Sequence, residues 1–352
     1  MSFFKRNLTK TALEALYFSA SHYLLAPKWS GVGVIFTLHY IRPFTTPEGF
    51  WPNRILDITP EFLETAICAV KQSGYKIVSL DEVSQRLNEQ RFDRKFAAFT
   101  LDDGYLDNFV YALPIFEKHE IPFAVYVASG LPECQMIMWW EILERLIREN
   151  PRIDINCADQ SFNLSTESVR QKYQAFNVIY WALRKLPEAQ QSAAIQEIID
   201  HYEFDWQGLC RSSSMTWDMI RQLSRHPLAT IGAHTVHHHS LSKLKPEQVK
   251  EEAHEGKVKI EQETGILPTH FAYPYGDAGS AGPREFEIMR ESGFTTATTT
   301  RKGVLFPEHG KHLHALPRVS LNGDYQKERY VKLFLRGTPF ALSNRFKRLN
   351  VA

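Results

Sequence analysis

The chain alternates short apolar runs with longer stretches of helical periodicity. The apolar runs are bounded by turn or polar residues and predict buried strands at 32–38, 76–79, 96–101, 122–127, 228–233, 270–273, 294–298 and 316–321. Helical patterns separate many of them, at 59–72, 105–118, 216–225, 246–263 and 283–292. Strands that alternate with helices favour a parallel α/β fold. At this strand count we expect a distorted (β/α) barrel of seven or eight strands.

One region interrupts this alternation. Residues 139–214 are almost wholly helical in pattern, with a short hairpin expected at 154–164. We interpret the region as a helical insertion into a strand–helix connection and not as an independent domain. The expected organisation is therefore an N-terminal helical extension over 1–30, a barrel domain over 31–336 that contains the insertion, and a C-terminal tail over 337–352.

Charge and cysteine content narrow the classes of function. The 352-residue chain has a formal net charge of +1, which argues against a nucleic-acid partner, since that would need a basic face or stripe. A neutral sugar substrate requires no such basic surface. The four cysteines lie far apart and form no Cys-x-x-Cys pair, so we expect reduced thiols and no cysteine metal site.

The first 27 residues do not resemble an export signal. Glu14 and His22 interrupt what would be the apolar core of a signal peptide, and no clean small-x-small cleavage site follows. No uncharged apolar run is long enough to span a bilayer. We therefore predict a cytoplasmic protein whose N-terminal helix packs on the domain. The alternative is that this helix contacts the inner membrane surface, which would make the protein peripheral.

The first candidate catalytic segment is Thr-Leu-Asp-Asp-Gly at 100–104, where a predicted strand ends. Neighbours in a regular strand point to opposite faces, so Asp102 and Asp103 can share a pocket only where the chain turns. Gly104 permits that turn, and catalytic groups of barrels gather at the carboxyl ends of strands. The alternative is that the two carboxylates only cap the helix that follows.

A second segment, His-Thr-Val-His-His-His at 234–239, also follows an apolar strand. His234 and His238 are four residues apart, so they can face the same side of one helical turn and bind one metal. An aspartate and two neutral imidazoles make a three-ligand site with open positions, as a catalytic divalent metal needs. A solvated histidine tract is the alternative, and it suits His237 and His239, which we expect to point elsewhere.

Two further strand ends carry less specific candidates. The segment 271–277, Phe-Ala-Tyr-Pro-Tyr-Gly-Asp, predicts an irregular loop whose backbone N–H groups can face a pocket and stabilise an oxyanion. In isolation it is an ordinary turn. His39 emerges from the first strand and can donate a proton at neutral pH, although a lone histidine in that place also suits a structural role.

Together these segments resemble the polysaccharide deacetylase family (carbohydrate esterase family four), which includes chitooligosaccharide and peptidoglycan N-acetylglucosamine deacetylases. The first segment matches the family pattern Thr-Phe-Asp-Asp-Gly with Leu101 in place of Phe, and the second matches His-(Ser/Thr)-x-x-His. The resemblance implies that Asp102 is the general base. It also implies that Asp103, His234 and His238 bind one divalent metal ion, Zn²⁺.

The third family motif, Arg-x-Pro-(Tyr/Phe)-Gly, is matched only in part, because its arginine is Ala272 here. The resemblance makes the backbone N–H of Tyr275 the oxyanion donor. The usual late Leu-x-His motif, which supplies the general acid, has no match. Instead, the segment 36–43 resembles the N-terminal histidine segment of a permuted branch, the exopolysaccharide poly-N-acetylglucosamine deacetylases. This resemblance assigns the general acid to His39.

The missing arginine would leave Asp102 without the cation that keeps a buried base ionised. We expect Arg318 to replace it, since the last strand is otherwise apolar and has little other reason to carry a guanidinium. Arg42 is the other candidate, and an ordinary surface ion pair is the alternative for Arg318.

The resemblance implies a metal-dependent hydrolase that removes N-acetyl groups from an N-acetylglucosamine oligomer or polymer and releases acetate. Trp139, Trp140 and Tyr275 are candidate stacking surfaces for pyranose rings, and for the tryptophan pair a core role is the alternative. Two other functions remain open. One is a non-catalytic carbohydrate-binding relative, which the absent arginine would suit. The other is a metal-dependent amidase or esterase that acts on a non-sugar substrate.

Overall fold

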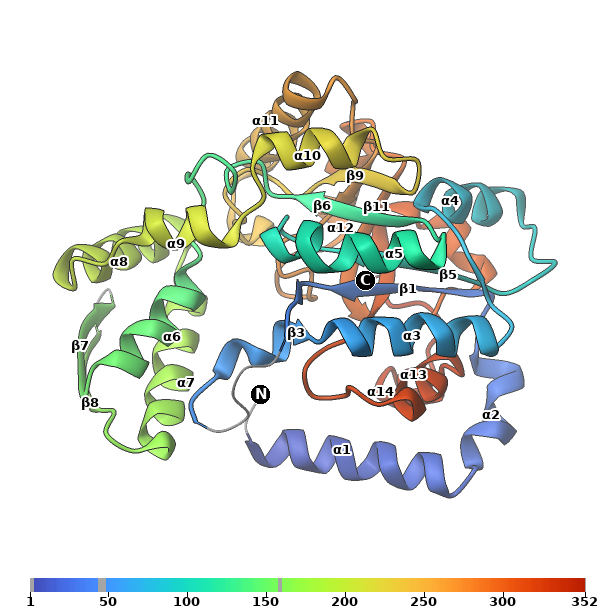
Figure 1. The fold of residues 1–352 in the computed structure, drawn as a ribbon, viewed down its shortest axis with the longest axis horizontal. Coiled ribbons are helices and arrows are strands. Elements are labelled where there is room, and N and C mark those ends of the chain that lie inside the picture. The colour runs from blue at the N-terminus through green and yellow to red at the C-terminus, as the bar shows by residue number, and fades with distance from the viewer. Residues whose placement is uncertain (1–2, 44–48, 158–159, 352) are drawn as a thin grey trace.

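The computed structural model describes residues 3–43, 49–157 and 160–351 (Figure 1). Its central feature is a closed barrel of seven parallel strands. Strand β1 (Gly33–Leu38) pairs with both β5 (Phe96–Leu101) and β12 (Leu316–Ser320), and this double pairing closes the sheet. The order around the barrel is β1, β12, β11, β10, β9, β6 and β5, and β4 (Lys76–Ile77) adds to the outside of β5. The predicted barrel is therefore confirmed.

The other barrel strands are β6 (Phe123–Val127), β9 (Ala229–Ala233), β10 (His270–Ala272) and β11 (Thr296–Lys302). β6 is an apolar run because one face lines the barrel interior and the other is covered by helices, whereas β11 is rich in threonine and buries Thr296, Thr298 and Thr299. Ile35, Ala98, Ala124, Tyr126 and Ala272 are all buried in one cluster from strands around the barrel. A short parallel pair, β2 (Tyr40–Ile41) and β3 (Asp57–Ile58), lies outside the barrel.

The helices around the barrel are α3 (Pro60–Gln72), α4 (Leu80–Glu89), α5 (Leu113–His119), α10 (Trp217–Ser224), α11 (Pro246–Thr264) and α12 (Pro283–Glu291). Thr59 caps α3 by accepting a hydrogen bond from the Phe62 N–H, as its Thr-Pro-Glu start predicts. The helix expected over 105–118 begins instead as a π-turn, Asn108–Ala112. Short 3₁₀ helices occupy Pro52–Leu56, Leu241–Lys243, Pro307–Lys311 and Leu313–Ala315.

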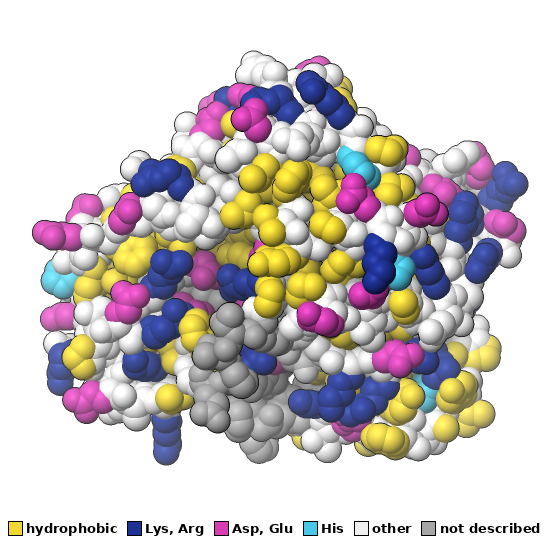
Figure 2. Space-filling model, viewed as in Figure 1, with side chains coloured by type: hydrophobic (Ala, Val, Ile, Leu, Met, Phe, Trp, Pro, Cys, Tyr) yellow, Lys and Arg dark blue, Asp and Glu magenta, His cyan; other side chains and the backbone are white. Residues whose placement is uncertain are grey.

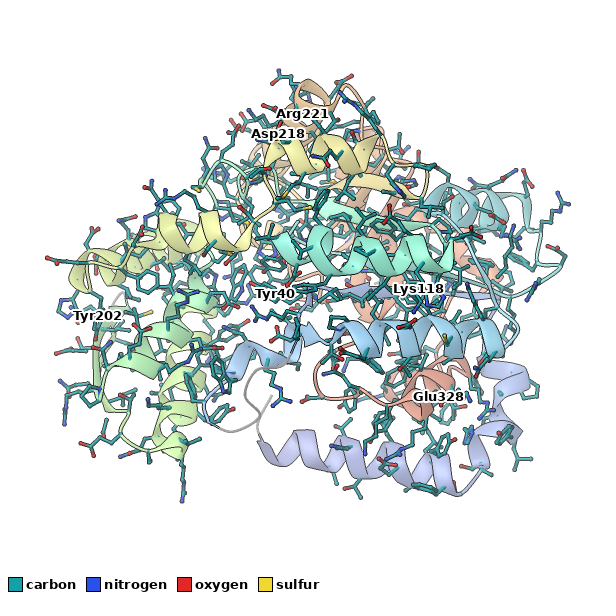
Figure 3. The ribbon with its side chains drawn as sticks, viewed as in Figure 1. Tyr40, Lys118, Tyr202, Asp218, Arg221 and Glu328 are labelled. Atoms are coloured by element: carbon teal, nitrogen blue, oxygen red, sulfur yellow. The ribbon has the colours of Figure 1, made fainter. Side chains whose placement is uncertain are left out.

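The insertion between β6 and α10 comprises α6 (Trp139–Glu149), the antiparallel hairpin of β7 (Arg152–Cys157) and β8 (Gln160–Ser165), α7 (Val169–Lys185), α8 (Glu188–His201) and α9 (Trp206–Ser213). The expected hairpin is confirmed, with bounds one or two residues wider. The insertion shares a hydrophobic cluster with Tyr40 and Tyr105, which follow β1 and β5. It therefore packs over the carboxyl ends of the barrel strands (Figures 1 and 3).

The two terminal regions meet on the opposite side of the molecule (Figure 1). They form α1 (Phe3–Phe18), α2 (Ser21–Trp29), α13 (Glu328–Leu335) and α14 (Thr338–Ser343). The N-terminal stretch that predicted one helix is two, because Ala20 adopts a left-handed conformation between them. Glu14 of α1 accepts hydrogen bonds from Arg329 and Tyr330 of α13. Among the described residues, no helix has the length and apolar character needed to cross a membrane.

Candidate active site and metal centre

The two adjacent carboxylates turn into one pocket at the end of β5. Asp103 has a φ of 76° and Gly104 a φ of 90°, so the alternation of the strand stops at Asp103 itself. Asp102 still follows the strand, and its N–H donates to the Leu38 carbonyl of β1. Both side chains are buried. The predicted turn is present, and it begins one residue earlier than the glycine that suggested it.

The histidine segment brings His234 and His238 together without a helix. Thr235 and His238 both have positive φ, 63° and 59°, and the segment is an irregular loop. The expectation of a helical turn was therefore wrong. The His238 N–H donates to Thr235 Oγ1, which holds the loop in this shape. The two imidazole centroids lie 5.0 Å apart.

Asp103, His234 and His238 form a buried group in which one potential ligand atom of each lies within 4.8 Å of the others. The Nε2 atoms of the histidines lie 3.3 and 3.4 Å from Asp103 Oδ1. The Ala272 carbonyl lies 2.7 Å from His234 Nδ1, so this nitrogen can donate to it and leave Nε2 with a free lone pair. The predicted ligands are thus brought together.

These atoms fit a divalent cation. Asp103 Oδ1 is buried and lacks a hydrogen-bond partner among the described residues, which is costly unless something positive lies against it. Burial would raise the pKa of Asp103, but the neighbouring histidines hold it below its usual range. Burial lowers the pKa of His238 to about 3, so its imidazole is neutral, which is the form that binds metal.

Arg318 of β12 lies inside the barrel and contacts Asp102 with both ends of its guanidinium. Nη1 and Nη2 each donate to one carboxylate oxygen at 2.6 Å. Nε donates to the Thr299 carbonyl and Nη1 also donates to Thr100 Oγ1, which fixes the orientation of the guanidinium. Burial alone would raise the pKa of Asp102, but Arg318, together with His234 and His39, more than offsets it and the pKa is lowered.

Arg42, the other candidate for the cation beside Asp102, forms an ion pair with a different carboxylate. Arg42 donates to both oxygens of Asp57 at 2.9 and 3.1 Å, and its guanidinium lies 4.1 Å from the Tyr40 ring centroid. His39, three residues earlier, does reach the site. Its Nε2 lies 3.9 Å from Asp102 Oδ2, and its side chain is 20% exposed, so it faces a solvent-accessible side of the site.

The loop after β10 presents Tyr275 with a φ of 59°, followed by Gly276 with a φ of 62°. Thr300 holds this turn, since its Oγ1 donates to the Tyr275 carbonyl and its N–H donates to the Gly276 carbonyl. The Tyr275 N–H has no backbone partner among the described residues. The Tyr275 and His238 rings lie 4.8 Å apart, which places this loop beside the ligand group.

The insertion covers this loop with three aromatic or cationic side chains. Trp139 Nε1 donates to Tyr275 Oη at 3.1 Å, and the Arg184 guanidinium lies 3.7 Å from the Tyr275 ring centroid. The Trp140 ring lies 5.2 Å from that of His238. Both tryptophans are buried in the insertion's cluster. They therefore form a wall of the site, and the contacts of Trp139 are with protein side chains.

His237 and His239 point away from the buried group, as expected. His237 Nδ1 lies 2.6 Å from Glu252 Oε1, and Glu252 Oε2 accepts the Val236 and His237 N–H groups. His239 Nδ1 lies 3.2 Å from Glu188 Oε2 of α8. His237, His239 and Glu252 also lie close enough to bind an ion, but the lone pairs of Glu252 are already used in anchoring the loop.

Two residues of the site wall were missed by sequence reasoning. The Tyr40 and Tyr105 rings stack at 3.7 Å beside Asp103, each directly after a catalytic segment. The Tyr105 hydroxyl is buried without a hydrogen-bond partner among the described residues. Their positions, one and two residues after His39 and Asp103, were the available signal. Arg184 gave no signal, because its helix belongs to no motif.

Comparison of the sequence with protein families matches residues 192–297 to the family described as polysaccharide deacetylase. This segment contains His234, His238 and Tyr275, but not Asp102 and Asp103. A comparison with curated protein sequences gave no match.

Comparison with solved structures finds deacetylases of the same fold. The deacetylase PplD of Streptococcus pyogenes, in complex with acetate, is 15% identical with a TM-score of 0.56, and the match covers 86% of this chain and 97% of that one. IcaB of Ammonifex degensii is 18% identical with a TM-score of 0.53 over 86% and 97% of the two chains. A de-N-acetylase of Aggregatibacter actinomycetemcomitans is 14% identical with a TM-score of 0.54 over 86% and 99%. At these identities the likeness establishes the fold.

Proposed function

Residues 192–297 match the polysaccharide deacetylase family and the fold is that of solved deacetylases, and on this basis we propose that the chain is a metal-dependent hydrolase. Its proposed reaction removes N-acetyl groups from an N-acetylglucosamine-containing oligosaccharide or polysaccharide and releases acetate. One observation carries the proposal: a buried ligand group of Asp103, His234 and His238 lies beside a second carboxylate, Asp102, that an arginine keeps ionised.

Asp103, His234 and His238 would hold the ion, and a carboxylate with two imidazoles suits Zn²⁺. When bound, such an ion supplies Lewis-acid polarisation of the acetamide carbonyl and makes water more acidic. The fit rests on the unpartnered Asp103 Oδ1 and on the neutral His238 imidazole.

The remaining steps belong to side chains and backbone of this chain. Asp102, ionised because of Arg318, accepts the proton of the attacking water. The Tyr275 N–H donates a hydrogen bond to the oxyanion that forms on the acetyl carbonyl. His39 lies next to Asp102 and would protonate the departing sugar nitrogen, so that acetate and a free amine are the products.

The experiment is a substrate panel with the purified protein and added Zn²⁺. It compares N-acetylglucosamine oligomers of different linkage with a non-sugar acetamide and an acetate ester, and it measures both acetate and new amine. Equal release of the two products from a sugar oligomer supports the proposal. Release from the non-sugar compounds alone would indicate an amidase or esterase, and oligomer binding without release would indicate a carbohydrate-binding protein.

A further inference from the structure

Helix α2 exposes two large apolar side chains, Tyr23 and Leu24, although Trp29 of the same helix is buried in the core. The solvent-facing positions 20, 23, 24, 27 and 28 follow helical spacing and carry Ala, Tyr, Leu, Pro and Lys, whereas His22 is buried. Leu24 is 85% exposed and Tyr23 is 59% exposed. The buried His22 Nδ1 lies 2.9 Å from the Leu16 carbonyl. The outer face of the helix therefore carries exposed Tyr and Leu side chains where polar residues are usual, and such a face is suited to a non-aqueous partner.

Other exposed apolar residues lie on the elements that pack around α2. Phe18 ends α1 and is 73% exposed, while Leu342 of α14 and Phe346 just after it are 50% and 53% exposed. Helix α2 packs against both α1 and α14. We call these side chains the terminal patch: Phe18, Tyr23, Leu24, Leu342 and Phe346. Figure 2 shows apolar and basic side chains gathered over the region of α1 and α2, at the lower right.

The charge of the two terminal segments differs from that of the rest of the chain. Residues 1–30 contain four basic residues and one acidic residue, and residues 336–352 contain four basic residues and none that is acidic. Their combined formal charge is therefore +7, against +1 for the whole protein, so the remaining residues carry −6. The near-neutral total conceals this separation, and the packing of α1 and α2 against α13 and α14 brings the two segments together.

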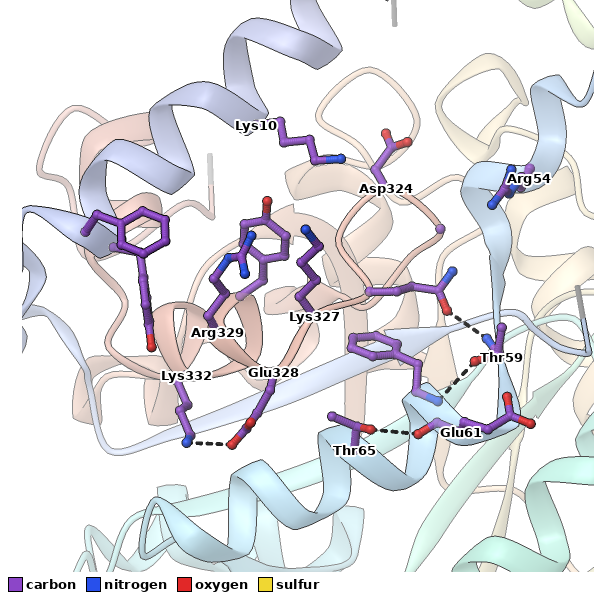
Figure 4. A pocket seen from close by; sticks show the side chains of 16 residues that line it. Lys10, Arg54, Thr59, Glu61, Thr65, Asp324, Lys327, Glu328, Arg329 and Lys332 are labelled. Atoms are coloured by element: carbon purple, nitrogen blue, oxygen red, sulfur yellow. Dashed lines mark hydrogen bonds and ion pairs between the residues drawn. The ribbon is translucent and has the colours of Figure 1, made fainter. Parts of the chain in front are cut away.

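A groove lined by five basic and three acidic side chains adjoins the patch at Phe18 (Figure 4). It measures about 820 Å³ and lies between α1, α3 and α13. Lys10 and Lys327 point into it, and among the described residues neither forms an ion pair with a carboxylate. Arg329 and Lys332 also line the groove, but each is paired with a glutamate. Two unpaired amines next to exposed aromatic rings favour a partner that is anionic as well as apolar.

We propose that the terminal patch binds the surface of a lipid bilayer that contains anionic lipid. Exposed Leu, Phe and Tyr side chains would enter the boundary between headgroups and acyl chains, and the surrounding lysines and arginines would face the lipid phosphates. A second copy of this chain would present the same positive charge, so a symmetric contact would be repulsive. The sign of the charge therefore favours the membrane over self-association.

The fold also sets the orientation of the bound protein. Helix α2 directly precedes β1 and so lies at the amino end of that strand, whereas the candidate active site lies at the carboxyl end beneath the insertion (Figure 1). Binding through the terminal patch would leave the site open to the aqueous side. Membrane binding is therefore independent of the proposed deacetylation, and an experiment can refute either proposal without refuting the other.

The test is co-sedimentation of the full chain with vesicles of phosphatidylcholine that contain about one third phosphatidylglycerol, compared with pure phosphatidylcholine vesicles. We expect binding to the anionic vesicles that salt weakens. The double variant Leu24→Glu/Phe346→Glu should bind at least about tenfold more weakly, because it adds two negative charges to the patch and removes two apolar anchors. Leu24 is exposed, and because the Phe346 ring lies 5.5 Å from that of the buried Trp29, the melting temperature of the double variant should be measured to check that it folds.

The matched control is Leu267→Glu, at a leucine that is 45% exposed on the loop between α11 and β10, away from the patch. It should bind vesicles as the unaltered protein does. Acetate release from a soluble oligomer should be the same for all three proteins. Absence of vesicle binding, or equal binding by the double variant, would overturn the proposal. So would light scattering that shows a dimer which the double variant abolishes.

Discussion

Both carboxylate oxygens of Asp102 accept a hydrogen bond from the Arg318 guanidinium at 2.6 Å, across the interior of the barrel. Ala272, at the position where the third motif of the resembled family has arginine, is buried in a cluster with Tyr126, and the Arg318 guanidinium lies 5.7 Å from the Tyr126 ring centroid. Arg318 of β12 therefore supplies the cation that we expected beside this buried carboxylate.

Replacing Arg318 should impair the base without emptying the metal site. In Arg318→Met, the pKa of Asp102 should rise because burial is no longer offset, so Asp102 would be protonated over more of the acidic range. We expect kcat to fall by about 10²–10⁴ and the acidic limb of the pH–rate profile to move to higher pH, with metal content unchanged. The measurement is kcat against pH together with metal analysis.

Two further variants separate charge from folding. An unpaired buried carboxylate costs about 3–5 kcal/mol of unfolding free energy, so the melting temperature of Arg318→Met should fall as well. Adding Ala272→Arg to Arg318→Met should restore part of both kcat and stability, whereas Arg42→Met should leave the acidic limb in place. If the acidic limb of the pH–rate profile of Arg318→Met is not shifted and its activity is near normal, Arg318 has only a structural role.

The ligand group predicts one divalent metal ion per chain. His234→Ala should lose about one equivalent of bound metal, and activity with it, because two ligands hold Zn²⁺ much less tightly than three. The control is His239→Gln, a neighbouring histidine that contacts Glu188 instead of Asp103. It should keep both metal and activity. Full occupancy in His234→Ala would remove the proposed metal centre.

The insertion should position Tyr275 through Trp139. Trp139→Phe deletes the hydrogen bond to Tyr275 Oη, so we expect kcat to fall about 3–10-fold with little change in KM, as for loss of one neutral hydrogen bond. Trp181→Phe is the matched control, because Trp181 is 48% exposed on α7 of the same insertion. Equal kcat values for the two variants would argue that the wall of the site serves packing alone.

Helix α1 should be retained in the mature protein. Leu13 is buried and Glu14 is hydrogen-bonded to Arg329 and Tyr330, so removal of the helix would expose part of the fold. We predict full-length protein in the cytoplasmic fraction, with a share on the inner membrane that salt releases. Mass spectrometry of fractionated cells tests this. A processed form in the periplasm or medium would contradict it.

The barrel was predictable because its strands are continuous apolar runs, and buried parallel strands leave that pattern. Helix α4 was not predicted because most of its residues are polar. Its position is determined by the Ser79 cap and by the packing of one apolar face. The sequence correctly predicted that Asp102 and Asp103 share one pocket, because Gly104 indicated a turn after the strand. The strained left-handed backbone conformation, however, is at Asp103, where a side chain disfavours it.

Contacts between segments far apart in the chain were harder to foresee. Arg318 stood out as a charge within an apolar strand, and that conflict with local pattern was the useful signal. Trp139 was a candidate for stacking on sugar rings, but nothing in its helix indicated the hydrogen bond to Tyr275, and Arg184 gave no signal because a basic residue in an amphipathic helix is ordinary. The charge separation at the termini was also hidden, because it exists only once the fold places both ends side by side.

The most direct test of the central claim is acetate release from an N-acetylglucosamine oligomer by the Zn²⁺-loaded protein and by its Asp102→Asn variant. The account predicts equal amounts of acetate and free amine from the unaltered protein. It predicts that Asp102→Asn keeps its metal but is slower by about 10²–10⁴. No acetate from any oligomer by the metal-loaded protein, or an unchanged rate in Asp102→Asn, would contradict it.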